Sequence, residues 1–255
     1  MAFTAVSHAQ EIVKLATRPG VNQWYFLAAL PANPRAVGLL FSGAAINLRD
    51  ESGQITFGTN NFLVRARGEF ISRGAIAAII DAPMDQHGSV SLDHEFRLGA
   101  DHFTDVAAVV SDLKRRFAAM PIFLIGNSMG TLSAAAAGAR LGDQIAGVVL
   151  TSTLLRQTPR NATLPGPGLS RFDFTSVKAP LLFVHHVSDQ CGATPYGDAA
   201  RYADKYPLIS VFGGAVPQSG PCDSFSQHGF FGKEAETIEQ IVNWMLKKPF
   251  QHEVK

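Results

Sequence analysis

One serine is enclosed by glycines in the segment GNSMG at residues 126–130, with Ser128 at its centre. An apolar run at 121–125 leads into this segment, and an alanine-rich stretch at 128–141 leads out of it. This context predicts a strand, a tight turn and a helix, with Ser128 in the turn. Because a helix N-terminus favours developing negative charge, a serine placed there could act as a nucleophile. The alternative is a glycine-bounded turn in which Ser128 only caps the helix.

A carboxylate and an imidazole that could activate such a serine follow later in the chain. Asp189 comes just after the apolar run at 180–185, and His228 lies in the segment SQHGF at 226–230, between the last predicted strand and the last predicted helix. A carboxylate can orient a histidine, and a neutral imidazole can take the proton of a serine. Asp189 could instead serve a turn. The rival residues are Asp173 and Asp198 for the acid, and His8, His87, His94, His102, His185, His186 and His252 for the base.

The elements that must position these side chains alternate along the chain. Strands are predicted at 23–30, 36–41, 74–80, 121–125, 145–150, 180–185 and 208–212, and helices at 61–72, 99–117, 128–141 and 233–247. From residue 74 onward the strands are continuous apolar runs, which is typical of strands buried on both faces. We therefore expect an α/β fold with a doubly wound, mostly parallel sheet, helices on both faces and antiparallel pairing near the N-terminal edge. Ligands of such sheets bind beyond the carboxyl ends of the strands.

On these residues the chain resembles the α/β-hydrolase fold family, over about residues 23–246. The resemblance implies a catalytic triad of Ser128, Asp189 and His228, in the family's order of serine, acid and histidine. It also implies an oxyanion hole made by the main-chain N–H of Met129 and by one N–H from the loop after residues 36–41.

In that loop Ala44 is the first candidate donor and Ala45 the second. Ser42 stands where the family commonly has a histidine. Because the donor is a main-chain group, this departure does not remove it. An ordinary tight turn is the alternative for the loop.

The length and composition predict a single domain over residues 1–255, since one α/β domain often reaches this size. The formal net charge of +1 gives no basis for binding nucleic acid, and no apolar run reaches the length of a membrane span. We find no cysteine or histidine cluster with zinc spacing, and we expect neither a metal nor another cofactor. The N-terminal residues do not resemble a signal peptide.

The two cysteines flank the predicted acid and base. Cys191 follows Asp189 by two positions, and Cys222 precedes His228 by six. If the acid and base meet, the cysteines come close enough for a disulfide, which would persist in a periplasmic or secreted protein whose leader is absent from this sequence. Two buried free thiols in a cytoplasmic protein are the alternative.

The interval from residue 151 to 179 is short and rich in proline and glycine, which predicts a minimal cap and an open site. The predicted function is a serine hydrolase, with a small-molecule carboxylic ester as the expected substrate because esters need the least activation of the leaving group. The same triad also serves amidases, peptidases, lactonases and thioesterases, and a non-catalytic binding protein on this fold is a further alternative. The sequence does not indicate an oligomeric state.

Overall fold

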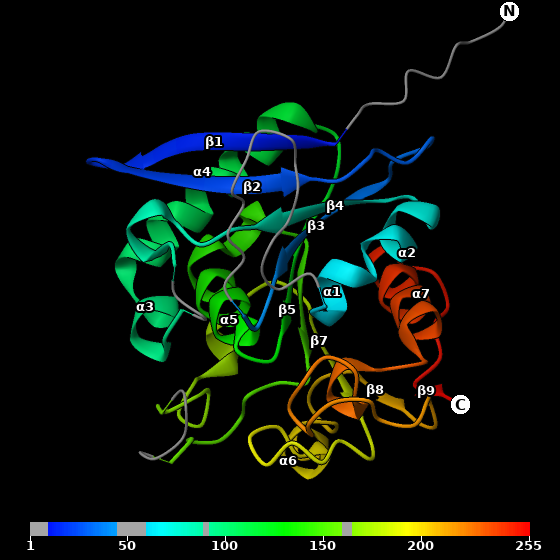
Figure 1. Cartoon of the computed structure of the whole chain (residues 1–255). Coiled ribbons are helices and arrows are strands. Elements are labelled where there is room, and N and C mark those ends of the chain that lie inside the picture. The colour runs from blue at the N-terminus through cyan, green and yellow to red at the C-terminus, as the bar shows by residue number, and fades with distance from the viewer. Residues whose placement is uncertain (1–9, 45–59, 89–91, 160–164) are drawn as a thin grey trace, which may run out of the picture.

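The computed structural model of the protein describes residues 10–44, 60–88, 92–159 and 165–255. Within them, nine strands form one mixed sheet in the order β1-β2-β4-β3-β5-β6-β7-β8-β9 (Figure 1). The strands are β1 Glu11–Arg18, β2 Val21–Leu27, β3 Ala36–Phe41, β4 Ala75–Ile80, β5 Ile122–Asn127, β6 Gly147–Thr151, β7 Leu181–His186, β8 Leu208–Val211 and β9 Glu253–Val254.

Parallel pairing joins the strands from β4 through β9 in the sheet order, whereas β1 pairs with β2 and β2 with β4 in antiparallel fashion. The mostly parallel α/β sheet and its antiparallel N-terminal edge are therefore confirmed.

Helices cover both faces of the sheet, with α4 and α5 on one side and α1, α2 and α7 on the other (Figure 1). The α-helices are α1 Phe62–Arg65, α2 Arg67–Ser72, α3 His94–Leu98, α4 Ala100–Arg116, α5 Gly130–Leu141, α6 Tyr196–Ala200 and α7 Glu234–Met245. Short 3-10 turns are η1 Met84–Gln86, η2 Gly142–Gln144, η3 Phe174–Ser176 and η4 Gln227–Gly229.

Two hydrophobic cores explain why the central strands are apolar throughout. In β3, Val37 and Leu39 pack into the core beneath α4 and α5, while Ala36 and Leu40 pack into the core beneath α1, α2 and α7. Successive side chains of a strand point to opposite faces, so a strand covered on both faces needs apolar residues at every position.

Some elements differ from the prediction. The helix expected at 61–72 is two helices, α1 and α2, separated at Ala66. Strand β1 was not predicted, because it lies at the sheet edge with only Val13 buried and so lacks a clear apolar pattern. Helix α3 and strand β9 are too short, at five and two residues, to give a periodic signal.

The order of the strands creates a switch point between β3 and β5. The chain passes from β3 to its neighbour β4 on one side and later places β5 on the other side, with Phe41 opposite Gly126. Loops that leave the carboxyl ends of two such strands diverge and open a crevice, which is where α/β sheets bind ligands. The loop after β3 and the turn around Ser128 after β5 both begin there.

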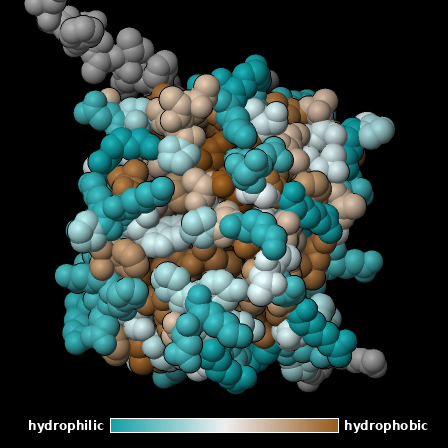
Figure 2. Space-filling model, turned by 180° about the vertical axis from the view of Figure 1, so that it is seen from behind, coloured by the Kyte–Doolittle hydropathy of each residue, from teal (hydrophilic) through white to brown (hydrophobic). Residues whose placement is uncertain are grey.

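The interval between β6 and β7 is short, as expected. Its described residues contain the turn η3 and one bridge between Thr158 and Gly166, but no α-helix. On the face seen in Figure 2, hydrophobic and hydrophilic side chains are intermixed. No helix in the described part of the chain is both long and apolar enough to cross a membrane.

Candidate active site

Ser128 occupies a strained turn between β5 and α5. Its φ angle is +54°, in the left-handed region that residues other than glycine seldom adopt. The N–H of Ser128 donates to the carbonyl of Thr151 (3.0 Å), and its carbonyl accepts from both the N–H and the hydroxyl of Thr131 (2.9 and 2.6 Å). These bonds fix the main chain on both sides of the serine. The half-buried side chain is thereby held at the N-terminus of α5.

The two glycines of the GNSMG segment are required by close packing. A Cβ atom on Gly126 would lie 2.5 Å from the carbonyl oxygen of Gly130, and one on Gly130 would overlap the carbonyl oxygen of Phe41. Neither backbone atom can move without displacing β3 or α5. The glycine spacing is therefore what allows strand, turn and helix to approach one another.

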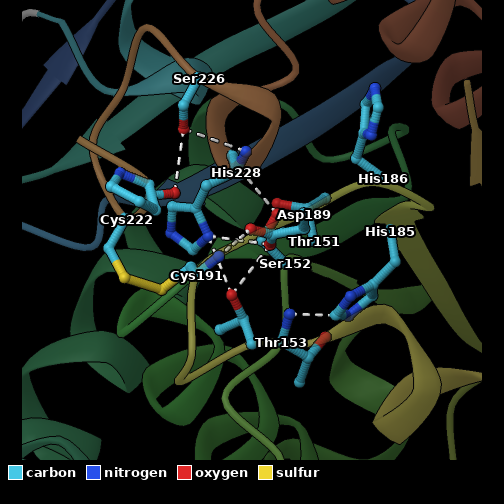
Figure 3. Close-up of polar contacts among 12 residues, drawn as sticks. Thr151, Ser152, Thr153, His185, His186, Asp189, Cys191, Cys222, Ser226 and His228 are labelled. Atoms are coloured by element: carbon cyan, nitrogen blue, oxygen red, sulfur yellow. Dashed lines mark hydrogen bonds and ion pairs between the residues drawn. A yellow bond between two sulfur atoms is a disulfide. The ribbon is translucent and has the colours of Figure 1, made fainter. Parts of the chain in front are cut away.

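Asp189 and His228 are bonded to each other at the carboxyl edge of the sheet (Figure 3). Asp189 Oδ2 lies 3.1 Å from His228 Nδ1, and both side chains are buried. Asp189 Oδ1 accepts the N–H of Cys191 at 2.9 Å. Because an ionised carboxylate only accepts hydrogen bonds, we assign the imidazole proton to Nδ1, which leaves Nε2 as the acceptor.

Thr194 contacts both residues of this pair, and the sequence analysis did not predict it. Its fully buried hydroxyl donates to Asp189 Oδ2 and lies 2.9 Å from both that oxygen and His228 Nδ1. A threonine in a loop carries no sequence signal for such a role, which only becomes visible once the loop is folded.

The turn at Ser128 and the loop carrying His228 meet at the end of β6. Thr151 accepts the N–H of Ser128, and the next residue, Ser152, donates its hydroxyl to the carbonyl of His228 (2.8 Å). The structure therefore brings all three sequence-predicted residues to one edge of the sheet. The contacts among described residues do not include a hydrogen bond from the Ser128 hydroxyl to His228, and such bonds often form only around a substrate.

The loop after β3 lies directly against this turn. A Cβ on Gly43 would be 3.2 Å from Ser128 Cβ and 3.6 Å from the main-chain nitrogen of Met129. Ala44, the next residue, is half-buried. Ala45, the second candidate donor, lies outside the described residues. The position of the loop suits an oxyanion hole, and the roles of Met129 and Ala44 stay predictions.

Two of the rival histidines, His185 and His186, have other partners. His185 is buried beside Thr153, whose N–H it accepts, and burial lowers the pKa of His185 to about 4. His186 lies within 3.0 Å of the carbonyl of Gly213 and accepts the N–H of Ser188, and burial lowers its pKa too. Both imidazoles are thus neutral and support the segments that follow β6, β7 and β8.

A second pair of aspartate and histidine lies near β4. His87 Nε2 is 3.3 Å from Asp81 Oδ2, and the hydrogen bond to Asp81 raises the pKa of His87. Asp81 follows β4, which pairs with β3 and β2 but not with β5. This pair is therefore one strand farther from Ser128 than the loop after β3.

A disulfide joins Cys191 to Cys222, with their Cα atoms 4.6 Å apart (Figure 3). The sequence prediction of this bond is confirmed. It connects the loop of Asp189 to the loop before His228. That second loop is also held by Ser226, whose hydroxyl donates to the carbonyl of Asp223 (2.8 Å) and accepts the N–H of His228 (3.2 Å).

Hollows in the surface lie at both ends of the strands. One hollow, of about 940 Å³, includes Arg35 and Gly74, which precede β3 and β4, so it lies at the amino edge, away from Ser128. Another, of about 530 Å³, is lined by Leu155, Arg156 and Tyr202 among others and follows β6 on the carboxyl side. Among the described residues, no cluster of three or more histidine, cysteine or acidic side chains could hold a metal.

A family model described as "Serine aminopeptidase, S33" matches residues 85–194, which include Ser128 and Asp189 but not His228. The structure is similar to that of Est1E from Butyrivibrio proteoclasticus, with a TM-score of 0.63 at 15% identity over 93% of this chain and 98% of that chain. It is also similar to an α/β serine hydrolase without a lid from Xanthomonas campestris, with a TM-score of 0.57 at 15% identity over 91% and 95%.

A cold-adapted esterase from an Arctic intertidal metagenomic library gives a TM-score of 0.54 at 17% identity, over 84% of this chain and 90% of that chain. A comparison with curated proteins finds no match. At these identities the structural likeness establishes the fold, and the chemistry has to be argued from the site.

Proposed function

We propose that this chain, whose structure has the α/β-hydrolase fold, is a serine hydrolase that cleaves carboxylic esters through an acyl-enzyme on Ser128. The observation that carries this proposal is the strained position of Ser128 at the switch point, with the bonded pair of Asp189 and His228 at the same sheet edge. Strained non-glycine residues concentrate where a side chain must be presented for chemistry.

In the proposed mechanism, His228 Nε2 takes the hydroxyl proton as Ser128 Oγ attacks the ester carbonyl. Asp189 holds the imidazole in the required tautomer and stabilises the imidazolium that forms. The N–H groups of Met129 and Ala44 donate to the oxyanion. His228 then protonates the leaving alcohol, and a water activated by the same histidine releases the carboxylic acid and restores Ser128.

The ester preference rests on the ease of the reaction. An alcohol leaves more readily than an amine, so esters need less activation of the leaving group than amides do. A peptidase or amidase is the second candidate, and the description of the matching family model favours it. Lactonase and thioesterase activities use the same triad.

The test compares p-nitrophenyl esters of increasing acyl length with the matching anilides. We expect the esters to be hydrolysed much faster, and a preference for anilides would favour the peptidase. Ser128→Ala is expected to abolish turnover, while Ser111→Ala, which changes an exposed serine on α4, leaves it intact. A folded Ser128→Ala variant with unchanged ester turnover would refute the proposal.

We also propose that the protein works in an oxidising compartment, periplasmic or extracellular. The Cys191–Cys222 disulfide supports this, because structural disulfides persist there and are rare in a reducing cytoplasm. Alkylation and mass measurement of protein taken directly from its source cells test the proposal. Two alkylated cysteines without prior reduction would contradict it.

A further inference from the structure

A buried arginine lies behind the loop that follows β3. Arg97, on α3, is only 3% exposed. Its Nη2 donates to the carbonyls of Ser42 and Gly43 (3.2 and 3.0 Å), its Nη1 to the hydroxyl of Ser133 (2.9 Å), and its Nε to the carbonyl of Leu92 (3.0 Å). The guanidinium thus ties the loop to the helix that begins beside Ser128.

This cation has no carboxylate partner within ion-pair distance among the described residues; its acceptors are neutral oxygens. Burial lowers the pKa of Arg97 to about 9, so the guanidinium is still charged at neutral pH. Burying an unpaired charge is costly, and a neutral donor could satisfy the same carbonyls at lower cost. The charge therefore calls for an explanation beyond holding the loop.

Peptide geometry shows what the guanidinium does to the loop. A trans peptide unit is planar, with its C=O and N–H on opposite sides, and no cis bond occurs in the described backbone. The carbonyl of Gly43 faces Arg97, so the N–H of Ala44, in the same peptide unit, points the opposite way. The carbonyl of Ser42 fixes the N–H of Gly43 in the same manner.

The turn that carries Ser128 packs against Gly43 as well. The direction of a Cβ on Gly43 leads to Ser128 Cβ at 3.2 Å and to the nitrogen of Met129 at 3.6 Å. Gly43 is therefore held between a fixed cation on its carbonyl side and the turn of the nucleophile on another side.

We propose that Arg97 is the positioning residue of the oxyanion hole, an inference that rests on the proposed function. By binding the carbonyl of Gly43, Arg97 aims the N–H of Ala44 at the oxyanion. A charged donor on the carbonyl also polarises the peptide unit, which makes its N–H a stronger donor. The contribution is largest in the transition state, where the negative charge develops.

The experiment measures steady-state kinetics of Arg97→Met, Arg97→Lys and Arg140→Met. Arg140 is the matched control, because it is an exposed arginine that likewise donates to two main-chain carbonyls, those of Leu98 and Gly99. For Arg97→Met we expect kcat to fall about 10²-fold, the scale of losing one oxyanion donor, with KM changed by less than about threefold. Arg97→Lys keeps the charge, so its kcat is expected to lie between those of Arg97→Met and the wild type.

A second readout separates this role from general damage. A thionoester develops its negative charge on sulfur, a weaker hydrogen-bond acceptor than oxygen, so its hydrolysis depends less on the oxyanion donors. The ratio of ester to thionoester kcat/KM should therefore drop in Arg97→Met and stay unchanged in Arg140→Met. The ratio in Arg97→Lys serves the same purpose if the methionine variant does not fold.

Two results would overturn the inference: wild-type kcat in folded Arg97→Met, or equal losses on ester and thionoester. Failure of the proposed function gives a different result, because Ser128→Ala would then retain full turnover. An inactive Ser128→Ala combined with an unaffected Arg97→Met would sink the role of Arg97 alone.

Discussion

Reduction of the Cys191–Cys222 disulfide is expected to destabilise the protein by about 4 kcal/mol at 25 °C. The two cysteines are 31 positions apart, and the chain-entropy model gives this magnitude for a loop of that length. Oxidised and reduced wild-type protein keep the same side chains, so their comparison isolates the cross-link from any loss of packing. Cys222 is exposed, which gives a reductant access to the bond.

The assay is urea unfolding with and without dithiothreitol, followed by fluorescence. The free energy of unfolding should fall by about 3–4 kcal/mol on reduction, after allowance for residual structure in the unfolded chain. The variant Cys191→Ala/Cys222→Ala should show no effect of dithiothreitol. A difference below about 1 kcal/mol in the wild type would refute the claim that this bond restrains the unfolded chain.

Three other substitutions test separate contacts. Thr194→Val removes a donor to Asp189 and should lower kcat about tenfold, with Thr194→Ser restoring it; unchanged kinetics would contradict the bond's importance. Gly43→Ala pushes a methyl group toward Ser128 and should lower kcat about tenfold with little change in thermal stability. Both kcat and the melting temperature are measured for the variant and the wild type.

A substitution at His102 tests the pH dependence of stability. Burial lowers the pKa of His102 to about 3. Below pH 6.5 the unfolded chain takes up a proton that the folded chain excludes, so stability should fall as the pH is lowered. Between pH 6.5 and 5, the free energy of unfolding should fall by about 2 kcal/mol less in His102→Leu than in the wild type. Urea unfolding at the two pH values measures this difference, and equal losses in both proteins would contradict the prediction.

The parts of the site that could be predicted from sequence depend on local pattern and chain order. Ser128 was found because an apolar strand, two glycines and a helix leave a continuous signature around it. Asp189 and His228 followed from their place after successive strands of the fold. The pairing of Cys191 with Cys222 followed from that convergence, and the structure confirms it.

The parts that could not be predicted depend on contacts between distant segments. Arg97 binds acceptors between 5 and 55 positions away, and no periodic pattern connects them. Thr194 is one of many loop threonines until its hydroxyl is seen against Asp189. Strand β1 shows the same limit in the fold, because a half-exposed edge strand does not need the apolar residues that marked the central strands.

The nucleophilic role of Ser128 is the central claim, and covalent labelling tests it most directly. Folded protein is treated with a fluorophosphonate, digested, and the modified residue located by mass spectrometry. We predict a single adduct on Ser128 that is absent from Ser128→Ala and unaffected in Ser111→Ala. Folded protein that carries no adduct, or carries it on another residue, would contradict the account.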